Sequence, residues 1–486
     1  MQHLDSLRGD GDERVNLRRI GGVSALGALA GFGLDPIAAM QRIHAAHGPL
    51  AEIKLSSPSG RREAHYVLAA GAKYNKRVLS DPATFQSIGV MLPGPKNSAQ
   101  RRISNGLLGP SGPRHAHYRN LMLPPLRRAA IDALAAKMAE IIDREIANWP
   151  INAAIDLFPL AKRVTVQVAL ETLFPAPAGS GPAEALSAAD LITDHIRMES
   201  APAVRGCPVN FLGQPYRRML QHSEIVEAAL ARWVEADGEA LRADNLMSIL
   251  AHSPDETGAP PTLAGVLSNV PTLFAATFET SQTALSWALF LLAQHPSAAA
   301  ALLSELEAAP GEPAAFADQL GQCEWLDAAI KESLRVLPSV PTQTRRAVCD
   351  TDLVDCDLPA GAFVILSAFL TNRNPALYPE PDCYRPERWA AINPNQYEYL
   401  AFSAGPRLCI GAWFATTFLK LAVGRIMRRY RLKIAPGARI DQNVRLTMTP
   451  QKRGLPATIH PQDGRFEASQ VRGNITRLVR MEGARA

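Results

Sequence analysis

One long apolar segment constrains the fold of this chain more than any other feature. Residues 262–294, TLAGVLSNVPTLFAATFETSQTALSWALFLLAQ, end at His295-Pro296, where the proline disfavours further helix. A helix that is apolar on nearly all sides lies buried in the middle of a large protein. The rest of the chain must therefore surround this helix. The chain has 486 residues, 47% of them hydrophobic, which are enough to build that core.

Glu279 is the only formal charge between Glu256 and Glu305. A carboxylate in such a helix is costly to bury unless it is paired or functional. Thr277 and Thr280 lie beside it, and their hydroxyls can bond to carbonyls one turn back and bend the helix. The helix alone favours two interpretations equally: a functional acid, or a partly exposed glutamate among capping-type hydroxyls.

Helices dominate the secondary structure that the rest of the sequence predicts. Residues 35–47 and 115–149 have apolar residues at helical spacing, and more helices follow to about residue 250. Residues 52–70 predict a hairpin, and 342–370 are rich in strand-forming residues. No clean linker separates these parts, so we expect one mainly α unit with a smaller β region.

Charge and cysteine content exclude several classes of protein. The net charge of +5 is a small excess, which fits an acidic protein partner better than a nucleic acid. The six cysteines form no CxxC pair and indicate neither a zinc cluster nor a disulfide scaffold. The charged, mixed-sign N-terminus is not expected to be a signal peptide, and the apolar stretch 20–34 is expected to be too short for a spanning helix. We predict a cytoplasmic protein without a transmembrane anchor, in which residues 1–34 form a flexible lead-in packed on the body.

A pair of opposite charges lies on a second predicted helix. In EWLDAAIKESLRVLP, residues 324–338, Glu332 and Arg335 are three positions apart and therefore neighbours on the helix surface. Such pairs are common on solvated helix faces and contribute little to the stability of the fold. Arg388, in the later segment YRPERW, offers a further guanidinium that would complete a network.

A loop of small residues, AFSAGPRLCIG at 401–411, contains one cysteine. It fills every fixed position of F-x-x-G-x-R-x-C-x-G, and those positions are Phe402, Gly405, Arg407, Cys409 and Gly411. The pattern resembles the haem-binding loop of the cytochrome P450 family. Four further segments follow the family's order along the chain. GPRHAHYRNL resembles the family's H-x-x-x-R segment, and ATFETS resembles its oxygen-activating helix. KESLR resembles its E-x-x-R motif, and YRPERW resembles its P-E-R-F/W motif.

The resemblance, over roughly residues 35 to 460, implies the P450 fold, a triangular helical prism around a buried haem b. We expect one catalytic domain over residues 35–462, followed by a mobile C-terminal tail, 463–486. Cys409 would be the axial ligand of the haem iron as a thiolate, which favours O–O cleavage. Small residues around it let backbone amides approach the sulfur. Gly411 would let the chain turn beneath the haem without a clashing Cβ.

The resemblance also implies which cations bind the haem propionates. Arg407 would bind one propionate through charge-assisted hydrogen bonds. His115 and Arg119, four positions apart on one helix, would bind the other or share the first. Arg345 resembles the family's propionate-binding strand arginine, and the adjacent Arg346 is the alternative.

The implied activity is insertion of one oxygen atom of O₂ into a hydrophobic small molecule, such as a terpenoid, steroid, fatty acid or aromatic. Thr280 would hold the distal water network, and Glu279 would relay protons. The family usually has glycine after the alanine that corresponds to Ala276, where this chain has Thr277. Either this extra bulk narrows the pocket or the hydroxyl faces the substrate. The pocket is expected to draw on mostly apolar residues from 85–105, 190–215, 270–281 and 338–344.

Electrons are expected to come from NAD(P)H through a separate ferredoxin and ferredoxin reductase. Cations after the cysteine would either attract an acidic ferredoxin or form a solvated basic helix face: Lys420, Arg425, Arg428 and Arg429. One alternative function is a peroxide-driven peroxygenase, which typically lacks the acid–threonine pair and is therefore disfavoured by Glu279-Thr280. The other is a haem-thiolate sensor without turnover, which would need neither a proton relay nor an electron partner.

Overall fold

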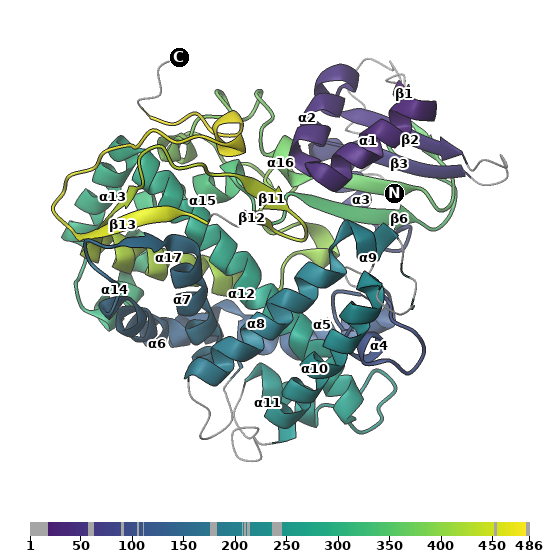
Figure 1. The fold of residues 1–486 in the computed structure, drawn as a ribbon, viewed down its shortest axis with the longest axis horizontal. Helices are drawn as coiled ribbons and strands as arrows, with labels where there is room; N and C mark the ends of the chain where they lie inside the picture. Colours follow the sequence, from purple (N-terminus) through teal and green to yellow (C-terminus); the bar gives the residue numbers. More distant parts are fainter. Residues whose placement is uncertain are drawn as a thin grey trace, which may run out of the picture.

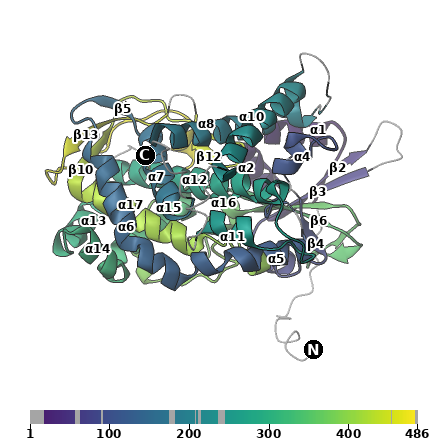
Figure 2. The ribbon, with the colours of Figure 1, turned by 90° about the horizontal axis from the view of Figure 1, so that it is seen from below.

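The predicted apolar segment is α12, Leu263–Gln294, and it crosses the interior of the molecule (Figures 1 and 2). The Thr262 hydroxyl accepts a hydrogen bond from the Gly265 N–H at 3.1 Å and starts the helix. The helices α4, α7, α10, α15 and α17 pack around it. Residues 266–275 and 281–295 are all buried, so the prediction of a central core helix is confirmed.

The computed structural model describes residues 18–482 except 57–62, 89–91, 105, 110, 175–181, 207, 209, 211–213, 236–244 and 452–453. The other helices are α1 (Gly22–Leu34), α2 (Pro36–His47), α3 (Ala72–Leu79), α4 (Ala99–Ile103), α5 (Pro113–Met122), α6 (Arg128–Ala147), α7 (Leu157–Thr172), α8 (Pro182–Glu199), α9 (Pro202–Gly206), α10 (Pro215–Glu235), α11 (Leu246–His252), α13 (Pro296–Ala308), α14 (Pro313–Gln319), α15 (Glu324–Val336), α16 (Ala368–Thr371) and α17 (Ala412–Arg429). Helices thus dominate, as the sequence predicts.

The strands are few and short. They are β1 (Arg18–Ile20), β2 (Leu50–Ser56), β3 (Glu63–Ala69), β4 (Phe85–Ser87), β5 (Ala154–Asp156), β6 (Thr342–Ala347), β7 (Thr351–Asp352), β8 (Asp357–Leu358), β9 (Phe363–Ser367), β10 (Tyr430–Ile434), β11 (Gln442–Val444), β12 (Met448–Pro450) and β13 (Pro456–Pro461). The largest sheet has the order β1-β2-β3-β9-β6-β4 and lies beside α1 and α2 at one corner (Figure 1).

The predicted hairpin is confirmed, because β2 and β3 pair antiparallel from Leu50↔Ala69 to Ser56↔Glu63. Its turn lies outside the described residues. The strand-rich region also forms, although its end is helical in α16. The helix expected over 115–149 is divided into α5 and α6 by a 3₁₀ turn at Pro124–Leu126. Prolines there lack the N–H groups that a continuous helix needs.

Both ends of the described chain are more ordered than expected. The glycine-rich segment forms α1, and β1 pairs parallel with β2, so this part of the lead-in belongs to the sheet corner. Its outward side chains Val23 and Leu34 are 85% and 84% exposed. The segment that we expected to be a mobile tail buries Ile475 and Val479, at 0% and 1% exposure. Its few apolar residues fill the core, which the low patterning of the sequence did not indicate.

Among the described residues, no single helix has both the length and the apolar character needed to cross a membrane. Helices α12 and α13 satisfy those requirements only as a pair that meets at a bend of 108°.

Candidate functional site

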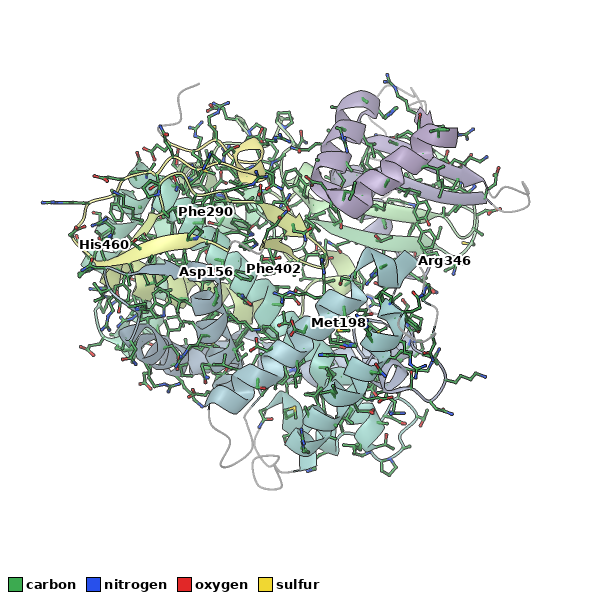
Figure 3. All side chains as sticks on the ribbon, in the orientation of Figure 1. Asp156, Met198, Phe290, Arg346, Phe402 and His460 are labelled. Atoms are coloured by element: carbon green, nitrogen blue, oxygen red, sulfur yellow. The ribbon has the colours of Figure 1, made fainter. Side chains whose placement is uncertain are left out.

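The Cys409 loop is held in a fixed backbone path between the sheet corner and α17. The Cys409 N–H donates to the Phe402 carbonyl at 2.8 Å, which closes the loop. Gly405 has a φ of +65°, and a Cβ there would lie 2.3 Å from the Leu79 carbonyl oxygen. Only glycine fits that position. Phe402 lies near the middle of the molecule (Figure 3).

The Cys409 thiol lies just before the N-terminus of α17. Its side chain is exposed in the bare protein, yet protein surrounds it closely enough for burial to raise the pKa of the thiol. Both observations fit a thiol that is accessible on one side and enclosed by protein on the others. The Gly411 N–H and the charge of Arg119 act in the opposite direction and lower its pKa. The helix N-terminus also favours a thiolate.

The protein's own atoms do not require glycine at position 411, and the expected clearance beneath a haem stays a prediction. The φ of Gly411, −92°, is open to any residue, and a Cβ there would meet no atom of the protein within 4 Å. The tight turn of this loop is at Gly405. What the structure shows at Gly411 is a backbone donor to the sulfur.

Cations from distant parts of the chain gather beside Cys409. Burial lowers the pKa of Arg407 to about 10, and the charge of Arg119 adds to this effect. Burial and the charge of Arg407 lower the pKa of Arg345 to about 10. Burial, Arg407 and Arg119 together lower the pKa of His115 to about 4. Arg119 and His115 lie on α5, and Arg345 lies on β6. The fold therefore places basic side chains from separate elements close to one another.

The alternation of strand β6 decides between the two adjacent arginines. Arg345 is 8% exposed, and the charge of Arg407 lowers its pKa, whereas Arg346 is exposed and lies at the sheet corner (Figure 3). Because successive strand side chains point to opposite faces, only one of them can face the cluster. That residue is Arg345.

The donor set of this site fits a thiolate-ligated haem. Among the described residues, neither Arg119 nor Arg345 forms an ion pair with a carboxylate. Arg345 instead donates to the Thr344 carbonyl at 3.0 Å and to the Gln343 amide oxygen at 3.3 Å. Clustered buried cations are costly unless anions neutralise them. The two propionates of a bound haem would supply such anions beside an accessible thiol.

α12 has one stretch that is not buried, and it is the stretch that contains the predicted catalytic residues. Between positions 266 and 295, only Ala276, Thr277, Glu279 and Thr280 are partly exposed. The hydroxyl of Thr280 donates to the Ala276 carbonyl at 2.8 Å, and that of Thr277 to the Leu273 carbonyl at 2.8 Å. These are the back-bonds that the sequence predicted. The Thr277 hydroxyl is therefore tied to its own helix.

The Glu279 carboxyl points toward a hairpin that sequence reasoning missed. Its Oε1 accepts a hydrogen bond from the Thr447 hydroxyl at 3.0 Å. Its Oε2 is buried and has no hydrogen-bond partner among the described residues. Burial raises the pKa of this carboxyl, and the Thr447 hydroxyl, Lys162 and Arg197 lower it. No local pattern marks Thr447, which lies 168 residues away in the sequence.

The predicted charge network forms completely and is buried. Arg335 binds both oxygens of Glu332 at 2.8 Å, and both side chains are 0% exposed. Arg388 donates to Glu332 at 2.9 Å. Trp389 adds an indole N–H to the same carboxylate at 3.0 Å, a contact that we did not predict. Since Arg335 also donates to the Cys383 carbonyl at 2.9 Å, the network joins α15 to the segment before the Cys409 loop.

A second missed network joins two of the segments expected to line the pocket. The backbone N–H of Leu92 donates to Glu199, and its carbonyl accepts from Gln100 at 2.9 Å. His195 in turn contacts the Gln100 amide oxygen at 2.8 Å. Burial raises the pKa of Glu199 to about 7. The network ties the chain before α4 to α8, and its members are too far apart in the sequence to suggest it.

Most of the cations that we expected to attract a partner are occupied within the protein. Lys420 pairs with Asp327 at 2.6 Å, and Arg425 donates to Asp143 at 2.7 Å. Arg428 donates to the Ala309 carbonyl at 2.9 Å. Only Arg429 of this set is exposed. These contacts give little support to the interpretation that the cations on α17 attract an acidic ferredoxin.

Comparison with known proteins matches the cytochrome P450 family model to residues 24–456. The chain is similar to cyclooctatin synthase of Streptomyces melanosporofaciens, with 28% identity over 83% of this chain and 87% of that protein. It is 27% identical to pentalenene oxygenase of Streptomyces avermitilis, over 81% and 86% of the two chains. The solved structure of retinoic acid bound cyanobacterial CYP120A1 shares the fold, with a TM-score of 0.72, 21% identity, and coverage of 87% and 94%.

Proposed function

The chain belongs to the cytochrome P450 family, and we propose that its Cys409 loop binds haem b for oxygenation of a terpene-like substrate with electrons from a ferredoxin. Members of this family use haem, O₂ and an electron donor, and the chain is accordingly a monooxygenase. One observation carries the proposal. The Cys409 thiol, at the start of α17, lies next to a cluster of cations that includes Arg119 and Arg407.

In this proposal, Cys409 ligates the iron, and Arg119, Arg345, Arg407 and His115 bind the propionates. His115 is neutral at physiological pH because its pKa is lowered to about 4, so it would contribute a hydrogen bond rather than a charge. When bound, thiolate-ligated haem supplies O₂ activation and transfer of one oxygen atom to a C–H bond. The protein's own contribution is to bind and orient the haem through these side chains.

Thr280 and Glu279 are proposed to deliver protons. The Thr280 hydroxyl gives its hydrogen to the Ala276 carbonyl at 2.8 Å, which leaves its oxygen able to accept from water on the partly exposed face of α12. Glu279 is the adjacent acid, and burial raises the pKa of its carboxyl. A carboxyl whose pKa is raised holds a proton more readily and can donate it as a general acid.

The substrate is proposed to be a hydrophobic small molecule of the terpene class. One similar protein is named for the oxygenation of pentalenene, a terpene. In this chain, Leu92 and Met198 pack against a buried apolar cluster made of Val204, Tyr216, Met219 and Leu220. The partly buried members, Leu92 and Met198, come from the expected pocket segments, and their apolar side chains favour an apolar ligand.

The electron donor is proposed to be an acidic ferredoxin that docks on a patch around the Cys409 loop. We define this patch as Arg127, Arg128, Leu408 and Trp413. The Arg128 guanidinium lies 4.6 Å from the centre of the Trp413 ring. Arg128 also pairs with Asp132 at 3.4 Å, and Asp132 accepts from the Trp413 indole N–H at 2.8 Å, so Arg127 is the cation of this patch that forms no ion pair with the described residues. Leu408, next to Cys409, and Trp413 are each 37% exposed. Exposed apolar side chains flanked by cations suit an acidic partner, and Leu408 places that partner close to the thiol.

Reconstitution with ferredoxin, its reductase and NADPH tests this function. We expect product only when all three components are present. The double variant Arg127→Glu/Arg128→Glu should raise the KM for ferredoxin by about tenfold, because charges at the rim of an interface mainly control association. The kcat at saturating ferredoxin should change little.

The matched control is Arg477→Glu, which reverses an exposed cation on the C-terminal segment. An equal rise in KM for this control would show that net charge, and not the patch, attracts the partner. Turnover driven by hydrogen peroxide without ferredoxin would instead support the peroxygenase alternative. Haem binding without any turnover would support the sensor.

A further inference from the structure

The tip of the β11–β12 hairpin reaches the proposed proton-delivery acid. Thr447 lies in the turn between the two strands, and its side chain is 3% exposed. Its hydroxyl donates to Glu279 Oε1 at 3.0 Å. The other carboxylate oxygen, Oε2, is buried and has no partner among the residues that the structure describes. Thr447 therefore supplies the hydrogen bond that orients this carboxyl.

The hairpin is itself anchored to α12 right beside this contact. The backbone N–H of Met448 donates to the Ser339 carbonyl at 2.8 Å, and its carbonyl accepts from the Trp287 indole at 2.6 Å. Trp287 lies on α12 and is fully buried. The Ser339 hydroxyl also donates to the Thr280 carbonyl at 2.9 Å. These hydrogen bonds connect the hairpin and Ser339 to α12 at both Glu279 and Thr280.

Charged groups near the acid act only from a distance. Lys162 on α7 and Arg197 on α8 lower the pKa of Glu279 by their charge, without a hydrogen bond to it. Lys162 pairs with Asp190 at 2.6 Å, and Arg197 pairs with Asp194 at 3.2 Å. Because both cations are engaged with other acids, neither fixes the direction of the Glu279 carboxyl.

We propose that Thr447 is a positioning residue for the monooxygenase reaction, which holds Glu279 through Oε1 and leaves Oε2 without a competing hydrogen bond. The inference rests on the proposed role of Glu279. A hydroxyl that donates to a carboxylate favours its ionised form. Loss of the Thr447 hydroxyl should therefore make Glu279 harder to ionise and leave its carboxyl without a fixed direction.

The test follows the protonation of Glu279 directly by infrared spectroscopy of the resting holoenzyme. The carbonyl band of the protonated Glu279 carboxyl is identified by its loss in Glu279→Gln. In Thr447→Val, which keeps the shape of the side chain, the titration midpoint of this band should move up by about one pH unit, the size expected for one hydrogen bond to a charged group. Thr447→Ser should restore the midpoint.

The matched control is Thr449→Val, on the same hairpin, whose hydroxyl forms no hydrogen bond with the described residues. An unchanged midpoint in Thr447→Val, or an equal shift in Thr449→Val, would overturn the proposal. Product formed per NADPH is measured in parallel and should fall in Thr447→Val. If Glu279→Gln itself leaves that yield unchanged, the proton-relay role fails, whereas the infrared shift still reports whether Thr447 holds the acid.

Discussion

Replacing Glu332 by glutamine is expected to lower the free energy of unfolding by about 3–5 kcal/mol, the cost of breaking a buried ion pair. The substitution keeps the shape of the side chain but removes its charge. Arg335 and Arg388 would then remain buried, at 0% and 8% exposure, without the anion that they share. Urea unfolding followed by circular dichroism measures the loss. The expected loss is a large part of the total free energy of unfolding, which is about 5–15 kcal/mol for typical folded domains.

The matched control for this effect is Glu387→Gln. Glu387 also pairs with an arginine, Arg385, at 3.1 Å, but the two side chains are 51% and 42% exposed. Exposed pairs contribute only about 0–1 kcal/mol. Equal losses in the two variants would mean that burial of the network does not stabilise the fold in the way described above.

Replacing Thr280 by alanine is expected to divert electrons to hydrogen peroxide and to lower product formation by about 10²-fold, the lower end of the contribution of general acid–base groups. The reason is loss of the hydroxyl on the partly exposed face of α12, beside Glu279. Haem content and substrate binding should be retained. The measurement is the ratio of product to peroxide per NADPH consumed.

Ser286→Ala serves as its control, because the Ser286 hydroxyl makes the same back-bond, to the Gln282 carbonyl at 2.7 Å, on the same helix. Ser286 is fully buried and away from the accessible stretch. If Thr280→Ala keeps the wild-type ratio of product to peroxide, the proposed role of Thr280 is wrong. If Ser286→Ala lowers the ratio as much, the effect comes from distortion of the helix.

Features encoded by local spacing were predictable from the sequence. The central helix, the β2–β3 hairpin and the Glu332–Arg335 pair all follow from periodicity or from neighbouring positions. The choice between Arg345 and Arg346 was not predictable in this way. A one-residue shift of a strand exchanges its two faces, and only the pairing of β6 with β9 and β4 fixes which arginine is buried.

Features that depend on contacts between distant segments could not be predicted. The Thr447 hydroxyl meets Glu279 only because the hairpin folds onto α12. Lys420 and Arg425 looked available to a partner because nothing in the sequence places Asp327 and Asp143 beside them. The motif marks Gly405 as a glycine, but the close approach of Leu79 on α3 that requires glycine there joins segments far apart in the sequence and could not be predicted.

The most direct test of the central claim is the carbon monoxide difference spectrum of the dithionite-reduced protein, recorded beside Cys409→Ser. Thiolate ligation by Cys409 predicts a strongly red-shifted Soret band that is lost in the variant. A band at the position typical of histidine-ligated haem, or no bound haem, would contradict this assignment, and the proposed roles of Thr280, Glu279 and Thr447 would fall with it.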